Sequence, residues 1–513
     1  MTRPSVVHRA LDAIERLGDR LPDPVFIFAW IIAALVAASV ACAGLGVSAV
    51  NPATGETLQA QSLLAPANVR QLLVEMPRTL TSFAPLGYVL LIMLGAGVAE
   101  RVGLLSATIR VMVKVSPRTL VTPMVILLGL LSNHAADTGF VILLPLAGAA
   151  FAAVGRHPIA GIAAAFAGVV GSFAGNPLPG QFDALILGLS EPAARLIDAQ
   201  WTANLAGDWF FTAAACCLFV PVAWWVTVRI VEPRLGAWSP DHDAPAHDAP
   251  LSDLERRGLA WAGGIAVAVI ALWAALALAP GAPLTDPAAA GPARWTPFFR
   301  ALVAGFFVLF LASGIAYGRV TGAIRSDRDL VALASDSMAS MAPYIVLAFA
   351  AAHFIALFTW SNLGAIIAIH GAQAIRTSGL PIPVLLVMIV LLTAALDMLI
   401  GSASAKWAAL APVLVPMLML LNVSPEMTTA AYRMGDSTVN MASPLMPYFG
   451  LVLGFCQRWK PGFGVGGLIS TMLPYSAALM LAGTLMTGAW GVLELPTGPG
   501  APVHYSGIAR LPG

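Results

Sequence analysis

The side chains of this chain that are best suited to chemistry are charges embedded in long apolar runs. They are Asp137, Asp183, Asp397, Lys406, Arg433 and Asp436. If those runs lie in a membrane, each buried charge costs about 3 kcal/mol or more, so such residues usually mark a substrate or ion pathway. We therefore take these six residues as the first candidates for a functional site.

Neutral oxygen ligands interrupt the same runs. Ser132 and Asn133 precede Asp137, Asn176 begins a Pro-Leu-Pro break, and Ser402 and Ser404 precede Lys406. Such side chains and exposed carbonyls at the ends of half-helices are typical Na⁺ ligands. The pattern predicts a Na⁺ site from Asn133, Asn176 and Ser402, with Asp137, Asp397 and Lys406 as candidates for ion coupling or proton transfer.

Arg433 and Asp436 are three residues apart and share a helix face. One interpretation is that Arg433 offers its planar fork to a substrate carboxylate while Asp436 holds it or exchanges a proton. The other is that the two neutralise each other. In the same way, Lys406 either pairs with Asp397 or meets an anion, and a deeply placed Trp407 offers a flat aromatic ligand a stacking surface.

The composition shows which elements must carry these residues. Of 513 residues, 58% are hydrophobic and 10% are charged, against about 45–50% and about 25% in average soluble domains. A net charge of +1 without a basic block excludes a nucleic-acid partner. The four cysteines lie in apolar runs, so neither a disulfide framework nor a metal cluster is expected. We predict an all-α integral membrane protein.

Nine apolar runs are long enough to cross a bilayer as helices. They are 25–47, 83–100, 158–188, 209–231, 258–279, 298–318, 338–372, 425–456 and 464–489. Two further segments, 119–154 and 384–421, have a polar tip between two half-length apolar stretches, which is typical of a re-entrant hairpin.

With both hairpins re-entrant and the N-terminus inside, most basic residues fall on the inner side, as the positive-inside rule requires. Those inside include Arg101, Arg110, Arg156, Arg257, Arg458 and Lys460; those outside are Arg70, Arg78, Arg294, Arg376 and Arg510. The loop at 280–297 and the C-terminal tail are then predicted to lie outside.

The two halves of the chain repeat each other at an offset of 267 residues. This offset pairs Pro145 with Pro412, Pro158 with Pro425, Gly168 with Gly435 and Pro177 with Pro444. Because five crossings separate the two hairpins, the halves should be inverted repeats, an architecture that places binding sites near the membrane midplane in secondary transporters.

We therefore expect an organisation in five parts: an N-terminal segment 1–24, a first half 25–232, a cytoplasmic linker 233–257, a second half 258–490 and a tail 491–513.

Four strings of the chain resemble those of the AbgT family of p-aminobenzoyl-glutamate transporters. They are Gly155 to Gly168, Val231 to Gly236, Gly401 to Ala408 and Tyr432 to Thr438. The resemblance runs from about residue 8 to 490. It implies a homodimer with nine crossings and two hairpins in each subunit, in the bacterial inner membrane, importing p-aminobenzoyl-glutamate or exporting p-aminobenzoate-like drugs such as sulfonamides.

The resemblance also implies substrate-path residues, namely Asp183, Ser404, Trp407, Pro425, Arg433 and Asp436. One departure is Asp397, which stands where the family usually has Asn; an acid there can titrate, so the coupling ion is left open between Na⁺ and H⁺.

We expect an ion-coupled secondary transporter of an aromatic carboxylate, without another cofactor and without enzymatic activity. No Gly-rich phosphate loop for ATP occurs. Two alternatives are a dicarboxylate transporter of the same architecture and an intramembrane hydrolase with Ser402 or Ser404 as nucleophile and Lys406 as base. The hydrolase is disfavoured because Ser404 and Lys406, two apart, point away from each other on a helix.

Overall fold

The computed structural model describes residues 24–50, 55, 57–115, 120–132, 139–238, 251–279, 281–288, 294–397, 401–443, 446, 448–505 and 507. Over these residues the chain is mainly helical. The described part contains one sheet, in which β1 (Ser48–Val50) pairs antiparallel with β2 (Thr57–Gln59) and Ser48 lies opposite Gln59.

The helices of the first half are α2 (Pro24–Gly44), α3 (Pro66–Thr81), α4 (Ala84–Arg101), α5 (Leu104–Val115), α6 (Val121–Leu131), the π-helix η3 (Gly139–Leu143), α7 (Leu144–Ala153), α8 (Pro158–Gly171), α9 (Gln181–Ala194), α10 (Trp209–Val226), η4 (Thr227–Val231) and α11 (Glu232–Leu235). Those of the second half are α12 (Asp253–Leu278), α13 (Thr296–Arg300), α14 (Leu302–Thr321), α15 (Asp327–Ser340), α16 (Ala342–Trp360), α17 (Leu363–Ser378), α18 (Ile382–Asp397), α19 (Ala403–Met419), α20 (Pro425–Asn440), α21 (Phe449–Trp459) and α22 (Val465–Leu493).

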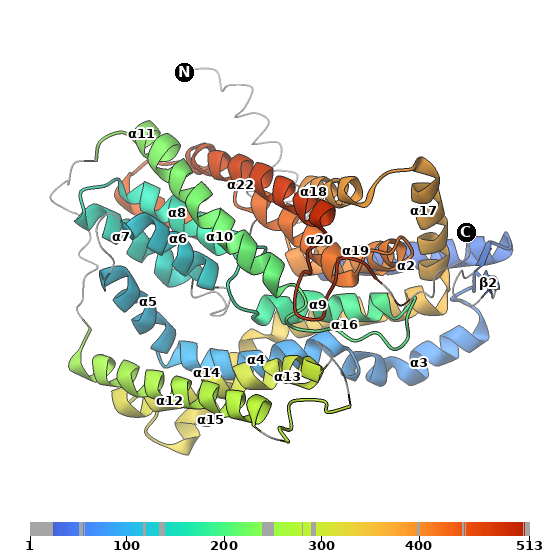
Figure 1. Ribbon diagram of the computed structural model, residues 1–513, viewed down its shortest axis with the longest axis horizontal. Helices are drawn as coiled ribbons and strands as arrows, with labels where there is room; N and C mark the ends of the chain where they lie inside the picture. The colour runs from blue at the N-terminus through green and yellow to red at the C-terminus, as the bar shows by residue number, and fades with distance from the viewer. Residues whose placement is uncertain are drawn as a thin grey trace.

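These helices lie in two layers. Figure 1 shows α4, α12, α14 and α15 along the lower edge and α8, α10, α20 and α22 above them. Within the lower layer, α14 packs against both α4 and α12. Helix α9 joins the layers, because it packs against α4 on one side and against α19 and α20 on the other. The upper layer also contains α6 and α7 of the first predicted hairpin and α18 and α19 of the second (Figure 1).

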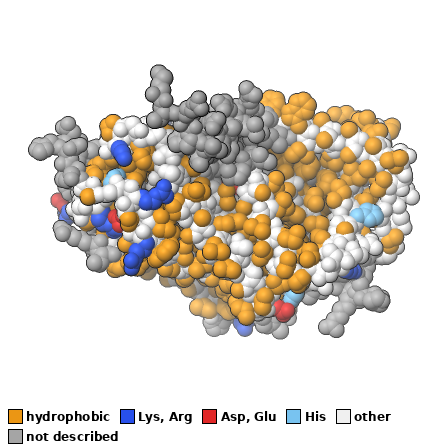
Figure 2. Space-filling view, turned by 90° about the horizontal axis from the view of Figure 1, so that it is seen from above, with side chains coloured by type: hydrophobic (Ala, Val, Ile, Leu, Met, Phe, Trp, Pro, Cys, Tyr) orange, Lys and Arg blue, Asp and Glu red, His pale blue; other side chains and the backbone are white. Residues whose placement is uncertain are grey.

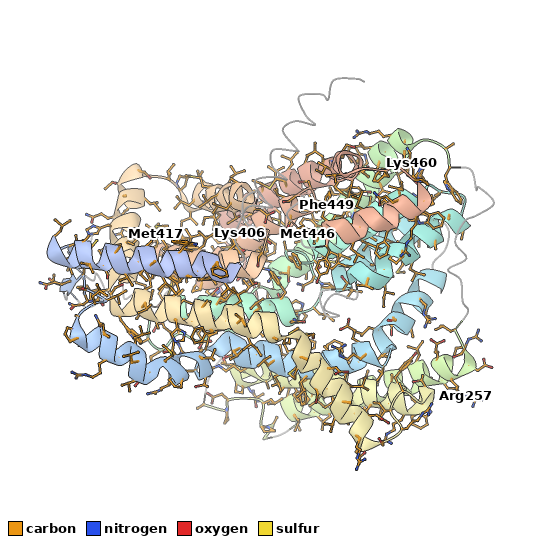
Figure 3. The ribbon with its side chains drawn as sticks, turned by 180° about the vertical axis from the view of Figure 1, so that it is seen from behind. Arg257, Lys406, Met417, Met446, Phe449 and Lys460 are labelled. Atoms are coloured by element: carbon orange, nitrogen blue, oxygen red, sulfur yellow. The ribbon has the colours of Figure 1, made fainter. Side chains whose placement is uncertain are left out.

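The molecular surface fits a lipid environment. Seen from above, it is mostly apolar, with the basic side chains gathered toward one end (Figure 2). Helix α12 exposes Trp261, Val267, Ile270 and Leu272, apolar side chains that lipid tails would cover. Arg257 and Lys460, both predicted to lie inside, lie toward the same end of the molecule (Figure 3).

Five segments of the described part are long and apolar enough to cross a membrane: 66–101, 209–235, 253–278, 302–321 and 465–493. A bent pair, 327–340 with 344–360, makes a sixth if it counts as one span. Three runs expected as single helices are divided into shorter ones: 158–188 and 425–456 each cover two helices, and 338–372 covers the end of α15, all of α16 and most of α17. The membrane helices are thus confirmed as a class, and the count of nine crossings stays a prediction.

The breaks occur where local chemistry opposes a helix. Gly175, Asn176 and Pro177 separate α8 from α9, since Gly and Pro destabilise a helix interior. Asn362 separates α16 from α17 and has a left-handed φ of 59°, a conformation that Asn tolerates better than most residues.

The 267-residue offset is visible in the helix bounds. Helices α8 and α20 begin at Pro158 and Pro425, each preceded by a side-chain cap. His157 Nδ1 accepts the N–H of Ile159 at 3.2 Å, and Ser424 Oγ accepts that of Met427 at 3.2 Å. Helix α8 lies between α6 and α7, as α20 lies between α18 and α19. The repeat therefore extends to packing, whereas the inversion of the two halves stays a prediction.

The paired glycines have the same packing role in both halves. A methyl group on Gly168 would lie 2.5 Å from the carbonyl oxygen of Ile126 on α6, and one on Gly435 would lie 2.2 Å from that of Val390 on α18. Only glycine allows each interrupted helix to approach the first arm of its hairpin so closely. Residues 133–138 at the first tip and 398–400 before the second lie outside the described residues. The second polar tip, 401–407, is described, and its residues from Ala403 on form the start of α19.

Candidate functional site

The candidate site surrounds α20, whose Arg433 and Asp436 are 1% and 0% exposed. Buried charges must be paired, because an isolated ion in the interior costs several kcal/mol. The structure pairs these two residues separately. They belong to two clusters, which we name the arginine cluster (Arg433, Asp183, Asp208) and the lysine cluster (Lys406, Asp397, Asp436).

In the arginine cluster, Arg433 Nη1 lies 2.7 Å from Asp183 Oδ1 and 3.4 Å from Asp208 Oδ2. Its Nε donates to the carbonyl oxygen of Phe173 at 2.6 Å. The guanidinium also lies over the ring of Phe182, 5.4 Å from the centroid. One cation thus meets two carboxylates and an exposed carbonyl of the α8–α9 break.

The broken helix positions Asp183. Asp183 lies in the first turn of α9, and its Oδ2 accepts the backbone N–H of Gly180 at 2.7 Å. The amide of Asn176 is 3.5 Å from the same oxygen. A carboxylate is favoured at a helix N-terminus, where backbone N–H groups lack partners. The break after α8 therefore creates the donors that hold Asp183 toward Arg433.

In the lysine cluster, Lys406 Nζ contacts Asp397 Oδ1 and lies 2.7 Å from Asp436 Oδ1. Tyr432 donates its hydroxyl hydrogen to the carbonyl oxygen of Ala403 and lies 3.3 Å from Asp436. Within the described part of the chain, the other carboxylate oxygens of Asp397 and Asp436 have no hydrogen-bond partner. Figure 3 shows Lys406 in the middle of the molecule.

These contacts decide two of the open alternatives. The idea that Arg433 and Asp436 neutralise each other is wrong, because the ion pairs of Arg433 go to α9 and to the residue before α10, and that of Asp436 goes to Lys406. The pairing of Lys406 with Asp397 is confirmed. Spacing on one helix could not separate these cases, since it says nothing of the charges that neighbouring helices supply.

Trp407 and Pro425 are joined by a chain of hydrogen bonds. Trp407 Nε1 donates to Ser190 Oγ at 3.0 Å, and Ser190 Oγ lies 3.0 Å from Thr429 Oγ1. Thr429 in turn donates to the carbonyl oxygen of Pro425 at 2.7 Å. The indole stacks on Tyr432 with centroids 4.4 Å apart and is 0% exposed. In this conformation Tyr432 occupies a stacking face that a flat ligand would need.

The remaining predicted residues are more scattered. Ser402 caps α19 by accepting the N–H of Ala405, and Ser404 is half-buried in the same first turn. The amide of Asn176 contacts Asp183 of the arginine cluster, whereas Asn133 and Asp137 lie outside the described residues. A Na⁺ site that combines Asn133, Asn176 and Ser402 stays a prediction. No group of three or more His, Cys, Asp or Glu side chains arranged for a metal ion occurs among the described residues.

Sequence reasoning missed Asp208, Ser190, Tyr432 and Glu426. Asp208 directly precedes an apolar run, and Glu426 directly follows Pro425 at the start of one. A search that included charges at the ends of runs would have found both. Nothing in the sequence marks Ser190, because its partners Trp407 and Thr429 come from distant segments. Tyr432 begins one of the four strings but carries no charge that would single it out.

The comparisons with known proteins agree with this architecture. The model of the AbgT putative transporter family matches residues 9–505. The p-aminobenzoyl-glutamate transport protein of Escherichia coli (strain K12) is 36% identical over 487 residues, which cover 95% of each chain.

Two solved structures are also similar. The YdaH transporter of Alcanivorax borkumensis, described as having an unusual topology, is 42% identical with a TM-score of 0.88, covering 93% of this chain and 100% of that one. MtrF of Neisseria gonorrhoeae, described as illuminating a class of antimetabolite efflux pumps, is 39% identical with a TM-score of 0.88, covering 96% of this chain and 100% of that one. This chain, with its apolar helices and buried ion-pair clusters, belongs to the AbgT family and is a multi-pass membrane transporter rather than an enzyme.

Proposed function

We propose that the protein is an ion-coupled secondary transporter of p-aminobenzoyl-glutamate or related p-aminobenzoate-like compounds. The observation that carries the coupling is the charge balance of the two clusters. Each contains one cation and two carboxylates, so each has one negative charge in excess when all groups are ionised. Burial disfavours that excess, and binding of H⁺ or Na⁺ removes it.

The contacts of α9 and α19 suggest how ion binding reaches the substrate path. Helix α9 supplies Asp183 to one cluster and Ser190 to the Trp407 chain, and α19 supplies Lys406 and Trp407 from adjacent positions. A change in either cluster therefore acts on helices that also hold Trp407. We infer that the hairpin-bearing layer moves against the layer of α4, α12 and α14.

The names of the relatives support the substrate class. One relative is a p-aminobenzoyl-glutamate transport protein, and another is described with antimetabolite efflux pumps. The proposal extends to the bacterial inner membrane, to a homodimer and to efflux of sulfonamides as one direction of use. Asp183, Ser404, Trp407, Pro425, Arg433 and Asp436 remain the proposed substrate path.

The position of Arg433 limits how it can bind a substrate carboxylate. Its Nη1 and Nε already donate to Asp183 and Phe173 in a site closed to solvent. Because Arg433 is 1% exposed, a substrate carboxylate would reach it only after the surrounding helices move. We therefore assign such binding to a conformation in which the cluster has opened.

The deciding experiment measures flux of labelled p-aminobenzoyl-glutamate into proteoliposomes under separate Na⁺ and H⁺ gradients. We expect one gradient to drive accumulation and Asp397→Asn, which removes a carboxylate at constant size, to reduce it strongly. Asp253→Asn, at an exposed position at the start of α12, serves as the control. Flux that ignores both gradients would contradict ion coupling, and competition by succinate alone would favour the dicarboxylate alternative.

A further inference from the structure

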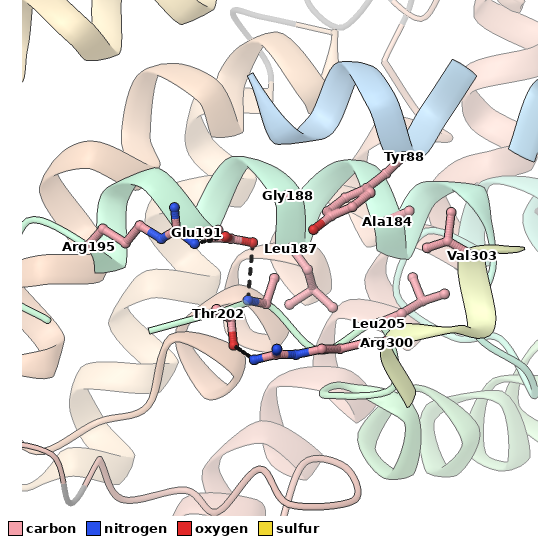
Figure 4. Close-up of a pocket in the computed structure, with 11 residues that line it drawn as sticks. Tyr88, Ala184, Leu187, Gly188, Glu191, Arg195, Thr202, Leu205, Arg300 and Val303 are labelled. Atoms are coloured by element: carbon pink, nitrogen blue, oxygen red, sulfur yellow. Dashed lines mark hydrogen bonds and ion pairs between the residues drawn. The ribbon is translucent and has the colours of Figure 1, made fainter. Parts of the chain in front are cut away.

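Two adjoining cavities lie outside the buried clusters, and the smaller one borders α9 on a different face from Asp183 and Ser190. The smaller has a volume of about 240 Å³ and is lined by Tyr88, Glu191, Arg195 and Arg300 together with apolar residues of α9 and α14. Figure 4 shows its polar side chains converging from α9, from the segment after it and from the end of α13. The smaller cavity is near the low end of ligand-sized pockets, so it suits one end of a substrate.

The larger cavity is about 1050 Å³ in volume and shares Thr202, Ala203 and Arg300 with the smaller one. Its wall is rich in aromatic side chains, namely Trp201, Phe210, Trp295 and Phe299. Aromatic rings prefer offset or edge-on contact with other rings. A cavity with this lining suits a flat aromatic group.

The segment 201–203 separates the two cavities and is held by charged residues. Arg195 Nε donates to the carbonyl oxygen of Trp201 at 3.0 Å, and Ala203 N–H donates to Glu191 at 3.2 Å. Arg300 donates to the hydroxyl of Thr202. The partition is therefore fixed by hydrogen bonds, and Arg300 stands at the junction of both cavities.

The charges at the junction favour an anion. Glu191 and Arg195 pair at 2.5 Å and balance each other. Arg300 has no carboxylate within 4 Å among the described residues. Two carboxylates also line the larger cavity. Asp198 already accepts hydrogen bonds from the hydroxyl of Tyr505 at 2.6 Å and from the backbone N–H of Gln200. Glu426 is buried, with 7% of its surface exposed. Arg300 is thus the charge available to a ligand carboxylate.

We propose that these cavities form an outer binding site for an aromatic ring joined to a carboxylate-bearing amino acid. The ring lies against Trp201, Trp295 and Phe299, and a carboxylate of the amino-acid end binds Arg300. The proposal rests on the proposed function and names the place where its substrate is first held. Charge-assisted pairing with the guanidinium of Arg300 orients the ligand. The aromatic wall adds contacts for a ring, so a ligand that has only the amino-acid end binds more weakly.

The position of the site in the chain supports this assignment. The larger cavity includes residues at 295–300 and 496–502, next to the loop and within the tail that charge placement predicts outside. Helix α9 presents Ala184, Leu187 and Glu191 to the smaller cavity and Asp183, Ile186 and Ser190 to Arg433 and Trp407. A ligand bound outside therefore contacts the same helix that carries the buried site.

The test is calorimetric binding to the purified full-length protein in detergent, with no ion gradient. The probes are p-aminobenzoyl-glutamate, p-aminobenzoate and glutamate. We expect Arg300→Gln to weaken p-aminobenzoyl-glutamate binding about tenfold, the effect of losing a charge-assisted contact, and Arg300→Lys to restore part of it. Trp295→Leu should weaken p-aminobenzoyl-glutamate and p-aminobenzoate alike, and glutamate alone should bind weakly to every variant.

Arg294→Gln is the matched control, because Arg294 is exposed and lies six residues before Arg300. It should leave the affinity within twofold of wild type. Equal affinities of wild type and Arg300→Gln, with Trp295→Leu also unchanged, would overturn the outer site, as would equal losses in Arg300→Gln and Arg294→Gln. If the variants show these affinity differences but neither ion gradient drives flux, the outer site stands and only the proposed ion coupling is contradicted.

Discussion

Arg433 and Asp183 lie 250 residues apart in the chain and meet in a buried ion pair of 2.7 Å. The pair joins α20 of the second half to α9 of the first. Asp183 lies in α9, just after the break that follows α8, and Arg433 lies within α20, the helix that the 267-residue offset pairs with α8. The contact thus ties the middle of α20 to the start of α9, next to the break after α8.

This contact predicts a strong energetic coupling. In a double-mutant cycle, Arg433→Ala and Asp183→Ala should couple by about 0.5–3 kcal/mol in the free energy of unfolding, as residues in direct contact do. The pair Arg433→Ala and Asp436→Ala should be closer to additive, because Asp436 pairs with Lys406. Unfolding in mixed detergent micelles measures both cycles. A larger coupling for Arg433 with Asp436 would contradict the two-cluster arrangement.

Lys406 should be essential for folding as long as both of its carboxylates remain. Lys406→Met leaves Asp397 and Asp436 buried without their cation, and breaking such a pair costs about 3–5 kcal/mol. Adding Asp397→Asn and Asp436→Asn should recover much of this stability without recovering transport. The measurements are thermal unfolding in detergent and flux in proteoliposomes. A triple variant that transports normally would show that the cluster is only structural.

The paired glycines should respond alike. Gly168→Ala and Gly435→Ala each force a methyl group against backbone oxygens of a hairpin arm, and overpacking of this kind costs about 1–3 kcal/mol. Gly171→Ala is the control within α8, because its methyl group would meet only side-chain carbons at 3.4 Å or more. Thermal unfolding compares the three. If Gly435→Ala is as stable as Gly171→Ala, the claim that the paired glycines are needed for close packing against the hairpin arms is wrong.

Trp407 should be sensitive to loss of its ring nitrogen alone. Trp407→Phe removes the donor to Ser190 and to the carbonyl oxygen of Ile186, and loss of a typical hydrogen bond costs about 0.5–1.5 kcal/mol. Trp225→Phe, at a lipid-exposed position of α10, should be nearly neutral. Unfolding and flux are compared for both variants. If the two variants lose equal stability, the hydrogen-bond chain from Trp407 to Pro425 carries little energy.

The cap of α8 should make stability depend on pH. Burial, with the charge of Lys460, lowers the pKa of His157. Because the folded state disfavours the protonated ring, the cap stabilises at neutral pH and is lost as pH falls through the range where histidine titrates. His157→Ser, which copies Ser424, should flatten the decline in melting temperature between about pH 7 and about pH 5. His370→Ser, at an exposed position of α17, should leave the slope unchanged.

The sequence by itself determined the class of the protein, its repeat and most of its buried charges. Fifty-eight per cent hydrophobic residues leave no alternative to a lipid environment. The repeated prolines at 158 and 425 mark the starts of equivalent helices, because Pro favours the first turn wherever it occurs. Such signals are local, and local preferences can be read without knowing the neighbours.

Only the tertiary structure decided which charges meet. The spacing of Arg433 and Asp436 suggested one pair, yet each residue finds its partners on other helices. The same holds for Trp407, whose ring is covered by Tyr432, and for Asp208, whose place before an apolar run does not reveal Arg433 as its partner. A buried charge pairs with the nearest opposite charge in space, and the packing of helices from distant segments sets that distance.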